Sequence, residues 1–156
     1  MSTPQLPVQY VRAGFALVPI PTGSKGPATK GWQHENAAIR SESGAAALSN
    51  CNLGLAHRWS GTCAIDVDDY LDALDFFCEH DIDLHAYLKA PDAVKISSGK
   101  TNRAKLLYRL PKQTIWLPTI KPHGSGVELR CANRDGTTSL QDVLPPSIHP
   151  DTGRPY

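Results

Sequence analysis

The chain has 156 residues and a formal net charge of +1, and 40% of its residues are hydrophobic. That length suffices for one folded domain with a buried core. No segment approaches the roughly 18 to 20 consecutive apolar residues that a membrane-spanning helix requires. The N-terminal segment lacks a basic stretch followed by an apolar one, which excludes a typical secretory signal. We therefore expect a cytoplasmic protein.

Helix and strand patterns alternate along the chain and predict an α+β fold with a mixed or antiparallel sheet. Helical patterns cover residues 5–12, 42–49 and 71–80, and strand patterns cover residues 15–20, 52–56, 63–67, 93–97, 104–110, 126–131 and 139–143. We expect the second and third of these strands to be joined by a turn around Ser60 and Gly61. A loop rich in glycine, proline and lysine occupies residues 21–32.

The charged residues are distributed unevenly. Residues 66–92 contain nine acidic residues and one basic residue, whereas residues 93–156 contain ten basic and four acidic residues. A site that holds cations and also handles polyanions needs both kinds of patch close together. Composition alone, however, favours a simpler interpretation, in which the acidic stretch is a solvated helix face.

The cysteines do not form a metal-binding pattern. They are scattered, with no CxxC pair and no histidine at zinc-finger spacing. We expect no structural zinc site, and we expect Cys63 and Cys78 to be core residues. The four positions are Cys51, Cys63, Cys78 and Cys131.

The segment CAIDVDD carries the strongest chemical signal. An apolar strand delivers Asp66 and Asp68 near its end, and the period of two along a strand places both carboxylates on one face. Two close carboxylates repel each other unless a cation lies between them. Mg²⁺ and Mn²⁺ prefer such oxygen ligands. The same spacing also occurs in haloacid dehalogenase-type phosphatases and in ordinary helix-capping clusters.

Two further segments place charged residues at alternate positions. In VKISSGKTNRAKLLYRL, a turn rich in serine and glycine precedes Arg103 and Lys105. Backbone N–H groups and two cations on one face suit a triphosphate, although an exposed basic hairpin is the simpler interpretation. In GSGVELRC, Glu128 and Arg130 share a face. Glu128 is either a third metal ligand or the ion-pair partner of Arg130.

Read in order, these segments resemble the N-terminal domain of bifunctional primase-polymerases of plasmids, phages and prophages, within the archaeo-eukaryotic primase superfamily. The resemblance covers about residues 10–156 and rests on GFALVPIPTGSKGPATKGWQ, NLGLA, AIDVDD, SSGKTNRAKLLYRL, GVELR and LPPSIHPDTGRPY. It implies an RRM-like core flanked by helices. It also implies that residues 1–156 are the catalytic domain, at the N-terminus of a longer replication protein.

The resemblance implies a role for individual residues. Asp66, Asp68 and Glu128 match the three carboxylates that hold two Mg²⁺ or Mn²⁺ ions. Lys105 stands where many members have a histidine that contacts the nucleotide phosphates, so this chain keeps a positive charge there but lacks an imidazole. The other candidate nucleotide-binding residues are Lys25, Ser98, Arg103, Arg130 and His149. Lys25 is equally well explained as a surface lysine, and His149 as a brace for a proline-rich turn.

The implied reaction is nucleotidyl transfer on a single-stranded DNA template. A 3′-hydroxyl attacks the α-phosphate of a nucleoside triphosphate, with one metal ion activating the hydroxyl and the other stabilising pyrophosphate. A helicase domain or partner is expected alongside this domain. Two alternatives remain: a non-catalytic module that binds single-stranded DNA or nucleotide, and a haloacid dehalogenase-type phosphohydrolase. The segment GSKGPATKG does not match the GxxxxGK[ST] loop of nucleoside triphosphatases.

Overall fold

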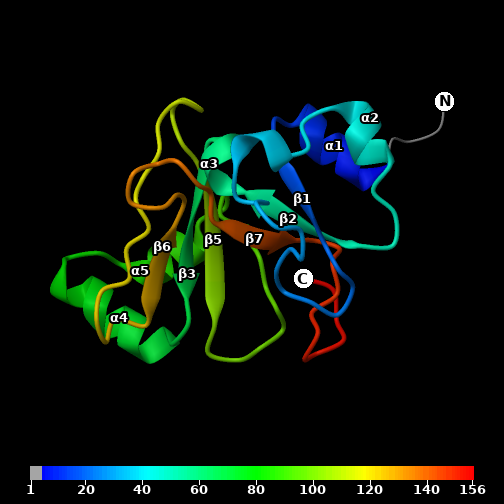
Figure 1. Cartoon of the computed structure of the whole chain (residues 1–156). Coiled ribbons are helices and arrows are strands. Elements are labelled where there is room, and N and C mark those ends of the chain that lie inside the picture. The colour runs from blue at the N-terminus through cyan, green and yellow to red at the C-terminus, as the bar shows by residue number, and fades with distance from the viewer. Residues whose placement is uncertain (1–4) are drawn as a thin grey trace.

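The computed structural model describes residues 5–156 and shows helices and two antiparallel sheets (Figure 1). Residues 1–4, which the sequence analysis assigns to the same domain, lie outside the described residues. The helices are α1 (Leu6–Arg12), α2 (Glu42–Ala46), α3 (His57–Ser60), α4 (Tyr70–Glu79) and α5 (Leu84–Lys89), with a 3₁₀ turn η1 (Glu35–Ala37). The strands are β1 (Leu17–Ile20), β2 (Asn52–Ala56), β3 (Thr62–Val67), β4 (Val94–Lys95), β5 (Ala104–Arg109), β6 (Val127–Arg130) and β7 (Gln141–Leu144).

The strands form two sheets. One sheet has the order β1-β2-β7, and the other has the order β4-β5-β3-β6. Every strand pairing is antiparallel. The α+β prediction is therefore confirmed, with the antiparallel alternative correct, but the sequence did not indicate that the strands divide between two sheets.

The connection from β2 to β3 is the first point at which the chain passes from one sheet to the other, and the connection from β6 to β7 is the return. The predicted turn around Ser60 and Gly61 is in fact the end of the short helix α3, which Gly61 terminates with φ of +62°. A Cβ atom on residue 61 would lie 2.9 Å from the Cα atom of Gln113, so this position requires glycine. The two strands consequently do not pair with each other.

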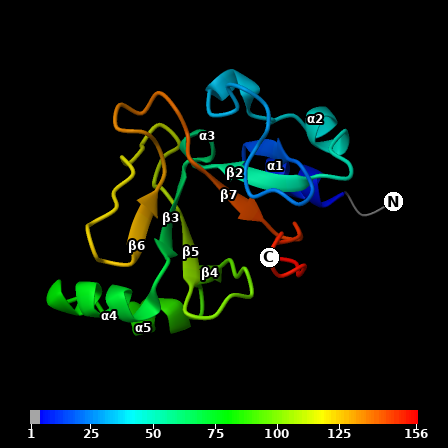
Figure 2. The same ribbon diagram turned by 60° about the horizontal axis from the view of Figure 1, so that its bottom comes forward.

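Helices α4 and α5 cover one face of the four-stranded sheet (Figure 2). Val67 and Val127 of the sheet pack there against Ala73 of α4 and Leu84 of α5. Asp69 caps α4 by accepting hydrogen bonds from the backbone N–H groups of residues 71 and 72, as expected for aspartate at this position. Because side chains alternate along a strand, Asp66 lies on the opposite face of the sheet from Val67. That face is the one turned towards β7.

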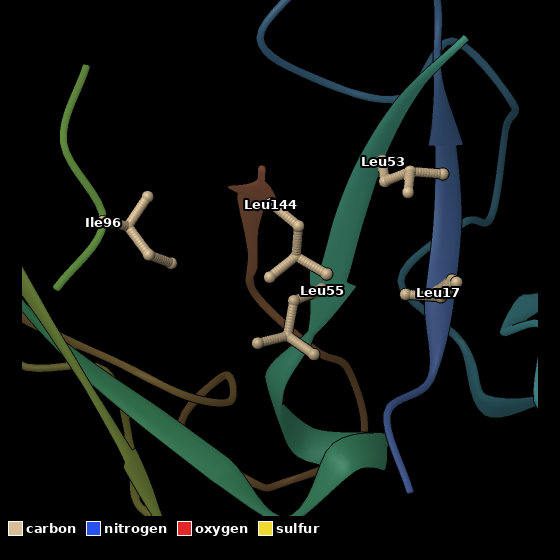
Figure 3. Close-up of a cluster of buried hydrophobic side chains, with 5 residues drawn as sticks. All are labelled: Leu17, Leu53, Leu55, Ile96 and Leu144. Atoms are coloured by element: carbon tan, nitrogen blue, oxygen red, sulfur yellow. The ribbon is translucent and has the colours of Figure 1, made fainter. Parts of the chain in front are cut away.

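A hydrophobic cluster joins the two sheets (Figure 3). Leu17, Leu53, Leu55 and Leu144 come from the three-stranded sheet, and Ile96 reaches them from the segment after β4. Burial of these side chains stabilises the packing of one sheet on the other. The cluster therefore fixes the position of β7 relative to β5 and β3.

The described residues also settle two simpler points. None of their helices is long and apolar enough to cross a membrane. All four cysteines are free thiols. Cys63 is buried as expected, but Cys78 is exposed on α4, so its assignment to the core is wrong.

Candidate active site

Asp66 lies at the centre of a row of charged residues that crosses three strands. In the strand register it stands opposite Lys105 of β5 on one side and Glu128 of β6 on the other. Its Oδ2 atom lies 3.2 Å from Lys105 Nζ. Burial raises the pKa of the Asp66 carboxyl; the Lys105 ammonium opposes this, and the nearby Asp142 and Asp68 charges add to it. The sheet thus brings together three residues that span more than sixty positions of the sequence.

A pocket of about 230 Å³ opens over this row, between β5 and β3 on one side and β7 and the C-terminal segment on the other. It contains most of the site residues that the sequence predicts. These are Lys25, Asp66, Ser98, Arg103, Lys105, Arg130 and His149. Lys100, Gln141, Asp142 and Tyr156 also line it. Five of the lining residues are lysine or arginine and two are aspartate, so the pocket favours anionic ligands.

Asp68 lies one residue beyond the end of β3 and outside the pocket lining. Its Oδ1 atom accepts a hydrogen bond of 2.7 Å from Arg103 Nη1, and Lys121 Nζ lies 3.5 Å from its Oδ2. Its backbone N–H donates to the carbonyl of Gly126. A Cβ atom on residue 126 would lie only 2.6 Å from the carbonyl oxygen of Asp69, so glycine is needed for this close approach.

Glu128 and Arg130 project from the same face of β6, as their spacing predicts. Arg130 Nη1 lies 3.0 Å from Glu128 Oε2, and Arg130 Nε lies 3.1 Å from Asp142 Oδ1. Both side chains are largely buried: the Arg130 side chain is 21% exposed and the Glu128 side chain 16% exposed. Arg130 is therefore the ion-pair partner of Glu128 in this conformation, and Glu128 lies beside the pocket rather than in its lining.

The three carboxylates fit a divalent cation in their chemistry, because Mg²⁺ and Mn²⁺ favour carboxylate oxygens. Residues directly opposite in neighbouring antiparallel strands have Cβ atoms about 4.5–5.5 Å apart, and Asp66 and Glu128 are such a pair. Among the described residues, however, no three acidic, histidine or cysteine side chains are gathered as metal ligands. Each carboxylate faces a lysine or arginine of the chain instead.

Lys25 reaches the rim of the pocket, where it meets Lys100 at a shared carboxylate. Asp151 Oδ2 lies 2.8 Å from Lys25 Nζ and 2.6 Å from Lys100 Nζ. Both ammonium groups hold the pKa of the exposed Asp151 carboxyl below its usual range. The sequence analysis singled out Lys25 but missed Lys100, which the turn after β4 brings to the same point.

His149 is buried and holds the C-terminal turn in shape. Its Nδ1 atom accepts hydrogen bonds from the backbone N–H groups of Asp151 and Thr152, and its ring lies 5.1 Å from the ring of Tyr156. Burial and the neighbouring Lys25 charge lower the pKa of His149. These contacts agree with one of the two interpretations of this histidine, in which it braces the turn. Ser98 lies in the facing turn, and its carbonyl oxygen accepts a hydrogen bond from Thr152.

Besides Lys100, two further residues at the site escaped the sequence analysis. Asp142 of β7 enters the pocket with its side chain 4% exposed, and it contacts Lys105 and Arg130. His57, fully buried at the start of α3, contacts it from behind. One signal was available, because a carboxylate in the apolar run LQDVL requires a partner if the strand is buried. Its partners lie on other strands, and the sequence does not show which strands are neighbours.

The comparisons with known proteins support one assignment. The family model for the bifunctional DNA primase/polymerase, N-terminal, matches residues 7–156. No curated protein and no solved structure matches the chain. The family match spans both sheets and every element that lines the pocket. The chain therefore belongs to the family of bifunctional DNA primase/polymerase N-terminal domains.

Proposed function

We propose that this domain joins nucleotides on a single-stranded DNA template, and that Asp66, Asp68 and Glu128 carry the reaction. The observation that supports this most is the register of β5, β3 and β6. It puts Asp66 between Lys105 and Glu128 at the edge of a pocket whose charged side chains are mainly cationic. Family membership points to DNA primase/polymerase chemistry, and this row is where the chain offers the groups for it.

The cationic side chains would bind and orient the triphosphate of the incoming nucleotide. Lys105 and Arg130 lie at the base of the pocket, next to Asp66, and Arg103 lies beside Asp68. Preorganised positive charges in a partly buried site stabilise the negative charge of a phosphoryl group more strongly than they would in water. Lys25 and Lys100 lie at the rim, where a longer phosphate chain would end.

The carboxylates would hold the divalent ions. When bound, Mg²⁺ or Mn²⁺ would supply a lowered pKa for the attacking hydroxyl and charge stabilisation for the leaving pyrophosphate. To serve as ligands, the three carboxylates would exchange their present lysine and arginine partners for the metal ions. These carboxylates are Asp66, Asp68 and Glu128. The phosphates of the nucleotide are the natural new partners for those lysine and arginine side chains.

A second function has an observation in its favour. Every one of the three carboxylates forms an ion pair with a lysine or arginine of the chain. A module that binds nucleotide or single-stranded DNA without turnover would keep these pairs. The experiment that tests the first function also tests this one.

The test is nucleotide incorporation on single-stranded DNA with labelled nucleoside triphosphates and Mg²⁺ or Mn²⁺, with and without a primer. We expect products that lengthen with time in the wild type and disappear in Asp66→Asn/Asp68→Asn, a near-isosteric change that removes two negative charges. The matched control is Asp75→Asn/Asp92→Asn, which removes two exposed acids, one on α4 and one between α5 and β4, outside the row and the pocket lining.

The outcomes separate the candidates. Products in the wild type and in the control, but not in the Asp66/Asp68 variant, support nucleotidyl transfer, and the unprimed reactions separate initiation from extension. Absence of product under both metal ions, with nucleotide or DNA still bound by the wild type, supports the non-catalytic module. Equal product from the Asp66/Asp68 variant would remove these carboxylates from the mechanism.

A further inference from the structure

Asp142 is the most deeply buried acidic residue of the pocket, and it belongs to neither the metal-ligand set nor the cation set. It lies on β7, in the three-stranded sheet, yet its side chain reaches residues of the four-stranded sheet. β7 runs close to β5 in Figure 1 and in Figure 2. A buried carboxylate is costly unless it is paired and hydrogen-bonded, so its partners indicate what it does.

Both oxygens of the Asp142 carboxylate are engaged. Oδ1 accepts hydrogen bonds from Lys105 Nζ and from Arg130 Nε, the latter at 3.1 Å. Oδ2 lies 2.8 Å from Nε2 of His57. Because a carboxylate only accepts, Nε2 carries a proton and donates it, and the other ring nitrogen, Nδ1, lies 2.9 Å from the hydroxyl of Thr62. The carboxylate is thus oriented from behind by a fully buried histidine.

Lys105 is shared between two carboxylates with very different exposure. It contacts Asp66, whose side chain is 21% exposed, and Asp142, whose side chain is 4% exposed. Arg130 is shared in the same way between Glu128 and Asp142. Asp66 and Glu128 are the residues that would turn to a metal ion, whereas Asp142 is too enclosed to do so. Asp142 therefore remains the counter-charge of Lys105 after Asp66 has changed partner.

We propose that Asp142 is a positioning residue that holds Lys105 directed at the phosphates of the incoming nucleotide; this inference rests on the proposed function. It also accounts for the lysine at position 105, where the family resemblance leads one to expect a histidine. An ammonium group 18% exposed requires a permanent counter-charge that a neutral imidazole does not. Asp142, oriented by His57, supplies that charge from the second sheet.

A double-mutant cycle between Asp142 and Lys105 tests the proposal. For each variant we would measure the KM for nucleotide, kcat, and the affinities for a nucleoside triphosphate and for the corresponding monophosphate. We expect Asp142→Asn to raise the KM by about tenfold and to weaken triphosphate binding by a similar factor, because a misplaced charged contact is lost. Monophosphate binding should change little. In the Lys105→Met background, Asp142→Asn should have almost no further effect, because the two residues act as one unit.

Thermal unfolding controls for loss of structure. Ser60→Ala removes a buried hydroxyl that bonds the backbone at residues 16 and 56, so it should lower stability without changing the triphosphate preference. If Asp142→Asn does not fold, the double variant Asp142→Asn/Lys105→Met takes its place, because it removes both charges of the pair. Equal KM values for this double variant and for Lys105→Met alone support the proposal.

If the wild type is active, any one of three results would overturn the proposal. They are an unchanged KM in folded Asp142→Asn, additive effects of the two substitutions, and an equal loss of monophosphate and triphosphate binding. A wild type that neither binds nor incorporates nucleotide would instead reject the proposed function itself, and with it the basis of this inference.

Discussion

The Asp142 carboxylate shows how much of this pocket depends on a single residue. Burial alone would raise its pKa, but the hydrogen bond with His57 and the positive charges of Lys105 and Arg130 hold the pKa well below its usual range. Removing one member of such a buried network leaves an uncompensated charge, which is strongly destabilising. The same residue therefore contributes to stability as well as to the geometry of the pocket.

This lowered pKa predicts a specific loss of stability in acid. In the unfolded chain an aspartate has a pKa of about 4, whereas the pKa of folded Asp142 lies below that value, so the unfolded state binds the proton first as the pH falls. The free energy of unfolding should be constant with respect to this group above about pH 5 and fall as the pH drops below about 4. Chemical denaturation at a series of pH values measures the slope.

Asp142→Asn is the comparison for that measurement. The variant should be less stable at neutral pH but should show a shallower decline of the free energy of unfolding between about pH 4 and pH 2. Identical slopes in wild type and variant would show that other carboxylates account for the acid sensitivity.

At the scale of elements, the turn before β6 determines where Asp68 lies. The carbonyl of Gly126 accepts the backbone N–H groups of Asp68 and Asp69, so the end of β3 and the start of α4 are both tied to this turn. Gly126 adopts φ of +63°, and Gly124, two residues earlier, adopts φ of +69°. Of these two glycines, only Gly126 has a backbone atom packed against the position of a Cβ atom.

Gly126→Ala should therefore destabilise the domain by about 1–3 kcal/mol more than Gly124→Ala, which bears only the cost of its positive φ. Both variants adopt a left-handed backbone conformation, so the difference isolates the close approach to Asp69. Urea denaturation of the two proteins measures it. Equal losses would mean that the turn moves to accommodate the added methyl group.

At the scale of the whole molecule, the two sheets share one hydrophobic cluster and one polar network. Leu55 is fully buried between them. Leu55→Ala should lower the free energy of unfolding by about 2–5 kcal/mol, because it leaves a cavity between the sheets. Unfolding should remain a single transition, since this cluster is shared by the two sheets.

Leu71→Ala is the control, because Leu71 on α4 is 67% exposed. Its substitution should change the free energy of unfolding by about 0.5 kcal/mol or less. Two separate transitions in the Leu55→Ala variant would show instead that the sheets unfold independently.

The site was predictable where it depends on local pattern and unpredictable where it depends on which strands are neighbours. The alternation of side chains placed Glu128 and Arg130 on one face, and the structure has them in contact. The same rule could not show that Asp66 lies between Lys105 and Glu128, because pairing is decided by the packing of the whole sheet.

Short elements were the other source of error. The sequence analysis missed α5, a helix of six residues, because one and a half turns give too little periodicity to recognise. It also missed α3, which carries His57, since four residues after a strand resemble a turn. The sequence analysis put Asp68 on the strand face of Asp66 and Arg103 on that of Lys105, but each of the two lies one residue outside its strand. The metal ligands and nucleotide contacts remain predictions.

The short crossing at α3 has a mechanical consequence for access to the pocket. The helix α3 has only four residues and ends at a tightly packed glycine, so this connection between the sheets is short and closely packed. The shared hydrophobic cluster and the contacts of Asp142 also hold the two sheets together. We therefore expect the floor of the pocket to resist widening by a hinge motion between the sheets. Its rim, in contrast, consists of turns held by exposed contacts such as those of Lys25 and Lys100 with Asp151, which cost little to break. We therefore expect a ligand to enter by rearrangement of these turns and not by movement of one sheet against the other.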